Sequence, residues 1–140
     1  MSEQVSNPAT ILVYSDDRTV RERVKVALGR RVAADLPEVE IVECATHQAV
    51  TRTLDAGGID LVIMDGEATP AGGMGLCRQV KDEIPECPPV LLLVARVADA
   101  WLATWSRAEG VLAYPIDPVR LAPTVAELLR ARLGAEASAS

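Results

Sequence analysis

Two uninterrupted apolar runs constrain the fold of this chain more than any other feature. Residues 61–64 read Leu-Val-Ile-Met, and residues 90–94 read Val-Leu-Leu-Leu-Val. Short apolar runs bounded by turn residues predict strands that are buried on both faces, as in parallel sheets covered by helices. The first run stops at Asp65, and a loop with Gly and Pro follows it. Ligands bind at the carboxyl ends of the strands in open parallel sheets, so Asp65 lies where a functional group is expected.

Strand and helix patterns alternate five times along the chain. The predicted strands are residues 11–14, 39–44, 61–65, 90–94 and 110–114. The predicted helices are residues 19–28, 47–54, 74–84, 98–108 and 118–133. This alternation predicts an α/β fold in which a five-stranded parallel sheet has helices on both faces. One domain is expected at residues 10–133, between a flexible N-terminus at 1–9 and a flexible C-terminal tail at 134–140.

Charge and cysteine content exclude several functional classes. The 140 residues carry a formal net charge of −6, which argues against a nucleic-acid-binding surface. Three cysteines without a Cys-x-x-Cys pair or a Cys/His cluster predict free thiols, which suit the reducing cytoplasm. No apolar run approaches the roughly 20 residues of a membrane span, and residues 1–8 lack the features of a signal peptide. We therefore expect a cytoplasmic protein that binds neither nucleic acid nor membrane.

Four short motifs that combine an apolar run with an acidic, Gly or Pro residue follow one another along the chain. They are residues 11–17 with Arg21, residues 65–76 with Asp65, Pro70 and Gly75, residues 89–95, and residues 110–117 with Tyr114-Pro115. Each motif alone is weakly specific. Their order and spacing over residues 11–133 resemble the receiver domains of two-component response regulators. The resemblance implies a flavodoxin-like three-layer fold with sheet order 2-1-3-4-5 and five flanking helices.

The family resemblance carries a chemistry for Asp65. In receiver domains an Asp carboxylate accepts a phosphoryl group from a phospho-histidine, and Mg²⁺ held by neighbouring acids bridges the negative charges. The resemblance implies that Asp65 is the phospho-acceptor. It also implies Mg²⁺ ligands at Asp16, at Asp65 and at the backbone of Glu67, with Asp17 as a further ligand if the strand contains a one-residue bulge.

Several positions depart from the family pattern. Ser15 stands at the first acidic position, Val94 at the hydroxyl position, Tyr114 at the lysine position and Val111 at the aromatic switch position. Loss of one preorganised donor from a charge-stabilising site costs on the order of 10²–10³ in rate. Val94 cannot bond a phosphoryl oxygen, and Tyr114 can donate one hydrogen bond but carries no charge. We therefore expect an atypical receiver with weak or absent Mg²⁺ binding and little or no phosphorylation of Asp65.

No segment for an output domain follows the receiver-like region, so the chain is expected to act through protein contacts and not as an enzyme. The resemblance implies a sensor histidine kinase or another protein as the partner. The fourth helix, fifth strand and fifth helix are the expected contact surface, and a homodimer through these elements is one alternative.

Two other functions remain open at this stage. The chain is either a phosphorylation-independent structural subunit of a larger assembly or, with less support, a small phosphatase of the haloacid-dehalogenase type. The second reading takes Asp65 and Glu67 as a degenerate nucleophile and acid pair. That motif belongs on a first strand and needs a downstream lysine, which the chain does not supply at a strand end.

Two local features also allow alternative readings. Asp17 precedes a predicted helix, so a helix-capping role is favoured over metal binding. Trp101 and Trp105 lie four residues apart on one helical face. They either pack onto the sheet or, because Trp is favoured at binding hot spots, contribute a contact to a partner or dimer.

Overall fold

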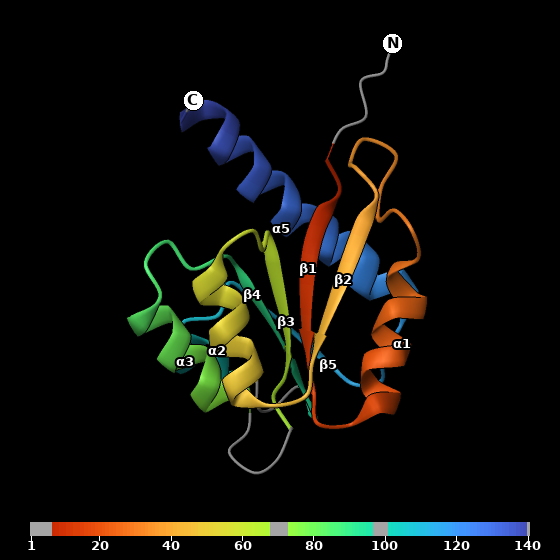
Figure 1. The fold of residues 1–140 in the computed structure, drawn as a ribbon. Helices are drawn as coiled ribbons and strands as arrows, with labels where there is room; N and C mark the ends of the chain where they lie inside the picture. Colours follow the sequence, from red (N-terminus) through yellow and green to blue (C-terminus); the bar gives the residue numbers. More distant parts are fainter. Residues whose placement is uncertain (1–6, 68–72, 97–100, 140) are drawn as a thin grey trace.

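The computed structural model describes residues 7–67, 73–96 and 101–139, and these form one sheet with helices on both sides (Figure 1). The strands are β1 (Ala9–Tyr14), β2 (Val39–Cys44), β3 (Leu61–Asp65), β4 (Val90–Val94) and β5 (Gly110–Ala113). The helices are α1 (Arg18–Leu28), α2 (His47–Ala56), α3 (Gly73–Glu83), α4 (Trp101–Ser106) and α5 (Pro118–Ala139).

The sheet has the predicted architecture. Its five strands are all parallel and lie in the order β2-β1-β3-β4-β5. Strands β3 and β4, which have the two uninterrupted apolar sequences, lie at the centre and are buried along their whole length. The register pairs Asp65 with Leu93, so the acidic end of β3 lies one residue short of the end of β4. The predicted fold class and strand order are therefore confirmed.

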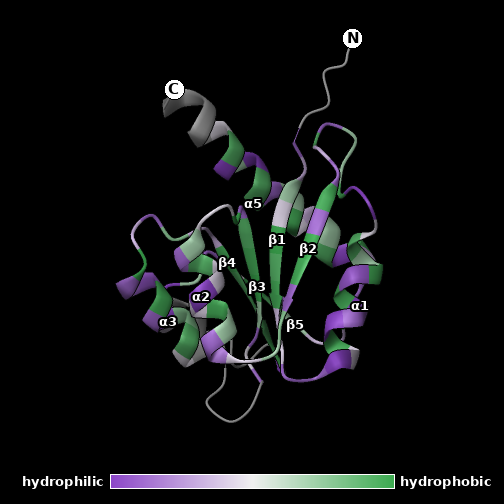
Figure 2. Cartoon of the chain, viewed as in Figure 1, coloured by the Kyte–Doolittle hydropathy of each residue, from purple (hydrophilic) through white to green (hydrophobic). Residues whose placement is uncertain are grey.

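Two apolar layers pack against opposite faces of this sheet. One layer joins α1 and α5 to β1 and β3 through side chains such as Val24, Val125 and Leu129. The other joins α2 and α3 to the opposite face through side chains such as Val50 and Leu76. Figure 2 shows the result as hydrophobic strands inside helices whose outer faces are hydrophilic. Because each fully buried aliphatic side chain contributes about 1.5–3 kcal/mol, these two layers hold the helices against the sheet.

Helix ends follow local capping rules. The Asp17 side chain accepts a hydrogen bond from the Thr19 N–H, so this residue caps α1 as expected. Gly29 ends α1 at a φ of 63°, a left-handed conformation that glycine adopts without a steric penalty. The chain then leaves the helix, and Leu36 returns to the core in a separate turn.

Helix α5 is longer than the sequence predicted. It continues through Gly134 to Ala139, whereas the expected end was residue 133 and a flexible tail was expected after it. Residues 135–139 are Ala, Glu and Ser, which extend a helix readily once it has started. Helix α4 is shorter than the expected 98–108, and residues 98–100 lie outside the described residues.

The carboxyl ends of the strands all point to one end of the molecule, where Asp65 lies (Figure 1). The start of β1 and the last turn of α5 lie at the opposite end. None of the described helices is both long enough and apolar enough to cross a bilayer.

Candidate functional site

Asp65 is a carboxylate at the end of a fully buried strand. It is the last residue of β3, and only 4% of its surface is exposed. The chain beyond it remains tied to the sheet, because the Gly66 N–H donates to the Leu93 carbonyl at 2.7 Å. Burial of an ionised carboxylate is costly unless hydrogen-bond donors surround it. The identity of those donors therefore decides what this site can do.

Three donors from three segments of the chain converge on the Asp65 carboxylate. The Ser15 hydroxyl donates to Oδ2 at 2.8 Å. The Tyr114 hydroxyl donates to Oδ1 at 2.7 Å, and the Glu67 backbone N–H donates to the same oxygen at 2.9 Å. All three donors are neutral, and both carboxylate oxygens are engaged. The burial of Asp65 is thus compensated by protein hydrogen bonds.

Ser15 is fixed in this role by its neighbours. It is fully buried just beyond β1, and its Oγ accepts a hydrogen bond from the Asp17 N–H at 3.0 Å. This acceptance directs the hydroxyl proton towards Asp65. The Ser15 carbonyl accepts a 2.6 Å hydrogen bond from Arg21, which also pairs with Glu43 at 3.0 Å. The Ser15 position is therefore anchored from both α1 and β2.

Tyr114 follows β5 directly and is half-buried. Its N–H donates to the Val94 carbonyl at 2.9 Å, which fixes the backbone from which the ring reaches Asp65. Burial, and then the hydrogen bond to Asp65, raise the pKa of the Tyr114 phenol well above its usual range. This raised pKa keeps the phenol protonated, and therefore a hydrogen-bond donor, at neutral pH. The sequence indicated that Tyr114 can donate one hydrogen bond, and in the structure the acceptor is the Asp65 carboxylate.

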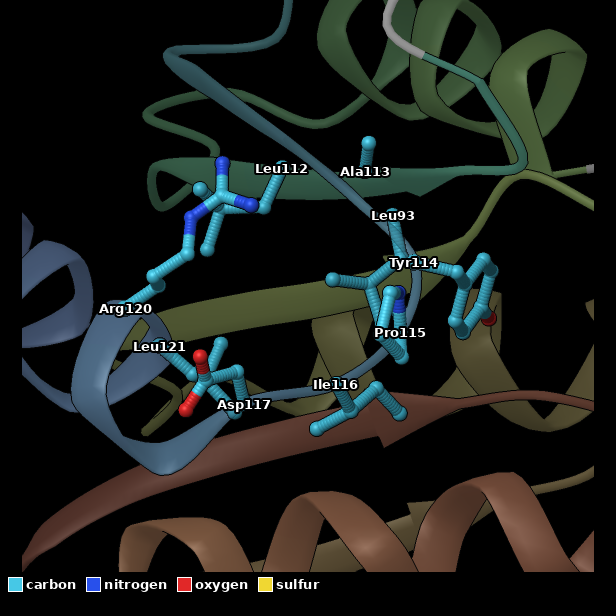
Figure 3. A pocket seen from close by; sticks show the side chains of 9 residues that line it. All are labelled: Leu93, Leu112, Ala113, Tyr114, Pro115, Ile116, Asp117, Arg120 and Leu121. Carbon is cyan, nitrogen blue, oxygen red and sulfur yellow. The ribbon is translucent and has the colours of Figure 1, made fainter.

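A small apolar cavity lies beside the turn that connects β5 to α5. Figure 3 shows the Tyr114 ring directed away from the side of this cavity where Leu112, Arg120 and Leu121 lie. The cavity volume is about 10 Å³. This is at the lower limit for a single water molecule, so the cavity is a packing gap rather than a ligand site.

The other predicted positions lie on β1, β4 and β5 or just beyond them. Val94 is fully buried at the end of β4, and it places a methyl surface where a hydroxyl would be needed. Val111 is half-buried on β5 and packs against the α2–α3 layer. Asp16 and Asp17 are both exposed beyond β1, and Asp17 serves as the α1 cap.

The hydrogen bonds around Asp65 bear on whether a divalent cation could bind there. Mg²⁺ requires oxygen ligands in near-octahedral geometry, supplied by carboxylates, carbonyls and water. Here the family's first acidic position holds the Ser15 hydroxyl, which donates a proton towards Asp65. Over the described ranges, no three His, Cys, Asp or Glu side chains are grouped to hold a metal. A cation at Asp65 would share the carboxylate with these three donors. Mg²⁺ ligation by Asp16, Asp65 and the Glu67 backbone stays a prediction.

Two contacts of the pocket were not anticipated from the sequence. Ser15 was identified only as a missing acid, although a hydroxyl at that position can serve as a donor. The Glu67 side chain is exposed, and its Oε2 also accepts a hydrogen bond from the Ala95 N–H at 3.2 Å. The sequence spacing could have indicated this contact, because an acidic side chain two residues beyond β3 can reach the end of the neighbouring strand β4.

Comparison with known proteins agrees with this architecture. A response regulatory protein found in two strains of Mycobacterium tuberculosis, described as uncharacterized, is 56% identical over 126 residues. The match covers 90% of this chain and 95% of the relative. No protein-family model matches the chain.

Solved structures share the fold. A two-component response regulator of the LuxR family from Aurantimonas has a TM-score of 0.75 at 24% identity, covering 90% of this chain and 88% of that chain. The chemotaxis protein CheY4 of Vibrio cholerae has a TM-score of 0.70 at 18% identity, covering 87% of this chain and 99% of that chain. Together with the relatives at 56% identity, the parallel sheet and the position of Asp65 show that this chain belongs to the response regulators of two-component signalling and has their receiver fold.

Proposed function

We propose that this receiver signals through protein contacts, with Asp65 phosphorylated weakly or not at all. The observation that carries the proposal is the set of three neutral donors on the Asp65 carboxylate. Phosphoryl transfer depends on cations that neutralise developing charge. At the positions where the family resemblance calls for an acid, a hydroxyl and a lysine, this chain has Ser15, Val94 and Tyr114. The pocket is suited to hold Asp65 in place, and we expect no catalytic turnover.

The proposed contact surface is the side of the molecule formed by α4, β5 and α5. Trp101 and Trp105 on α4 are 68% and 47% exposed, and Val119 at the start of α5 is 79% exposed. The exposure of both indoles favours the partner-contact reading over packing onto the sheet. Burial of a Trp at an interface often contributes more than 2 kcal/mol to binding. We propose a sensor histidine kinase or another signalling protein as the partner, with a second copy of this chain as the alternative.

The phosphorylation part is tested with acetyl phosphate and Mg²⁺, using intact mass as the readout. We expect no stoichiometric mass gain in the wild type and none in Asp65→Asn. A gain of one phosphate in the wild type that is absent from Asp65→Asn would overturn this part of the proposal.

A reconstructed variant supplies the positive control. Ser15→Asp, Val94→Thr and Tyr114→Lys together restore the acid, the hydroxyl and the cation expected from the family resemblance. We expect this variant to take up phosphate while the wild type does not. If the two proteins behave alike, these three positions are not what limits phosphorylation.

The contact surface is tested with sedimentation and with binding to purified kinase domains encoded by the same organism. Trp101→Ser with Trp105→Ser should weaken either self-association or kinase binding by at least tenfold. The matched control is Val26→Ser, because Val26 is 73% exposed on α1, away from α4. Unchanged binding in the double Trp variant would exclude α4 as the contact surface.

A further inference from the structure

Glu67 connects the ends of the two central strands. Its backbone N–H donates to Asp65 Oδ1 at 2.9 Å, while its side-chain Oε2 accepts from the Ala95 N–H at 3.2 Å. Asp65 ends β3, and Ala95 follows the last residue of β4. One residue thus supplies a donor to the buried carboxylate and a second carboxylate beside it.

The Ala95 N–H binds a carboxylate at the position where this fold binds ligands. The adjacent backbone groups serve the sheet, since the Leu93 carbonyl accepts from Gly66 and the Val94 carbonyl accepts from Tyr114. The Ala95 N–H instead points to the side chain of Glu67 at the carboxyl end of the strands. Backbone N–H groups in such positions bind the oxygens of anionic ligands.

The Tyr114 donor of the pocket is also in use. The Tyr114 hydroxyl, the remaining side-chain donor beside Asp65 Oδ1, is bound to that oxygen at 2.7 Å. An external anion could bind the Ala95 N–H only by displacing the Glu67 carboxylate, and it would then face the charge of Glu67 at short range. Like charges held close together at a protein surface repel by about 1 kcal/mol or more.

We propose that the Glu67 carboxylate is an internal anion, which occupies the Ala95 donor that an external phosphate-like anion at Asp65 would require. The pocket is then filled by its own chain, and Glu67 links β3 to β4 without a ligand. This inference deepens the proposed function, because it names the residue that excludes anions from the Asp65 pocket. Glu67 acts by occupying the Ala95 N–H and holding Asp65 Oδ1, and it takes no part in a chemical step.

The test follows the Ala95 amide resonance in nitrogen-15 spectra during titration with inorganic phosphate, against chloride at matched ionic strength. In the wild type we expect no specific movement of this resonance. In Glu67→Ala we expect saturable movement, with phosphate affinity increased by about tenfold or more because a donor is released and a charge is removed. Glu67→Gln should fall between the two, since its amide oxygen still accepts a hydrogen bond but carries no charge.

A matched variant separates local from general charge effects. Glu83→Gln removes one acidic charge at the end of α3, where that side chain bonds Gln79. Its Ala95 resonance should respond to phosphate as in the wild type. Since Glu67 is exposed, the Glu67 variants should keep the wild-type spectrum outside the pocket.

Two outcomes would overturn the inference. One is an Ala95 resonance that responds to phosphate equally in the wild type and in Glu67→Ala, and the other is no response in either protein. These results are independent of the mass measurement. Phosphorylation of wild-type Asp65 would overturn the proposed function, whereas an Ala95 response confined to the Glu67 variants would still support the internal anion.

Discussion

The Tyr114 hydroxyl donates a 2.7 Å hydrogen bond to Oδ1 of Asp65, a residue 49 positions earlier in the chain. This contact joins β5, at the edge of the sheet, to β3 at its centre. A neutral phenol satisfies the buried carboxylate but cannot cancel its charge. The same contact therefore stabilises the buried carboxylate without placing a cation beside it.

Tyr114→Phe should destabilise the fold measurably. The change removes one of three donors from a carboxylate that is 4% exposed, while the ring and most of its packing remain. Oδ1 keeps the Glu67 N–H as a donor, so the loss is that of one hydrogen bond to a charged group, about 1.5–3 kcal/mol in the free energy of unfolding. Urea denaturation followed by circular dichroism gives the value.

Tyr14→Phe is the matched control for that change. The Tyr14 hydroxyl is buried and has no hydrogen-bond partner among the residues that the structure describes, and its ring packs edge-on against His47 with 5.6 Å between centroids. Removal of an unpaired buried hydroxyl should leave stability unchanged or slightly higher. Equal losses from the two variants would show that the Asp65 hydrogen bond contributes little, and that ring packing dominates at both sites.

Both tyrosines should resist ionisation while the protein is folded. Burial is the main cause that raises the pKa of each phenol, and nearby carboxylates, Asp65 among them, raise it further. Above pH about 10, phenols of the unfolded chain lose protons that the folded protein retains. Stability should therefore fall as the pH rises beyond that value. Phenolate absorbance should appear together with unfolding, and independent titration of either tyrosine near pH 10 in the native protein would contradict this.

The sequence was sufficient for the fold and for part of the site. The uninterrupted runs of β3 and β4 specified a buried parallel sheet, and the position of Asp65 followed from the end of its strand. The sequence also indicated that the Tyr114 phenol can donate one hydrogen bond, but its acceptor, the Asp65 carboxylate, follows only from the structure. The contacts of Ser15 and Glu67 could not be predicted, since they depend on side-chain orientation in two loops. Side-chain rotation is not encoded in hydrophobic periodicity.

Asp35 should contribute to the loss of protein stability at low pH. Arg130 on α5 binds both oxygens of this carboxylate at 2.8 Å, and that hydrogen bonding lowers the pKa of Asp35 to about 2. A lowered pKa means that the stabilisation is present above the unfolded value of 3.8 and is lost as the pH falls towards 2. In Arg130→Gln, the carboxyl resonance of Asp35 should titrate close to 3.8. The same midpoint in both proteins would show that the pair does not persist in solution.

The Cys77 thiol should be nearly inert in the folded protein. It is fully buried on α3, and burial raises its pKa to about 11, although its Sγ donates to the Ser106 carbonyl at 3.4 Å. Only the thiolate is reactive, and at neutral pH about one molecule in ten thousand would carry it at that pKa. Iodoacetamide labelling read by peptide mass should therefore modify the half-buried Cys87 first. In urea, all three cysteines should react at similar rates, which provides the control for intrinsic reactivity. Native labelling of Cys77 at the rate of Cys87 would mean that the α3 layer opens readily, contrary to its tight packing against β3 and β4.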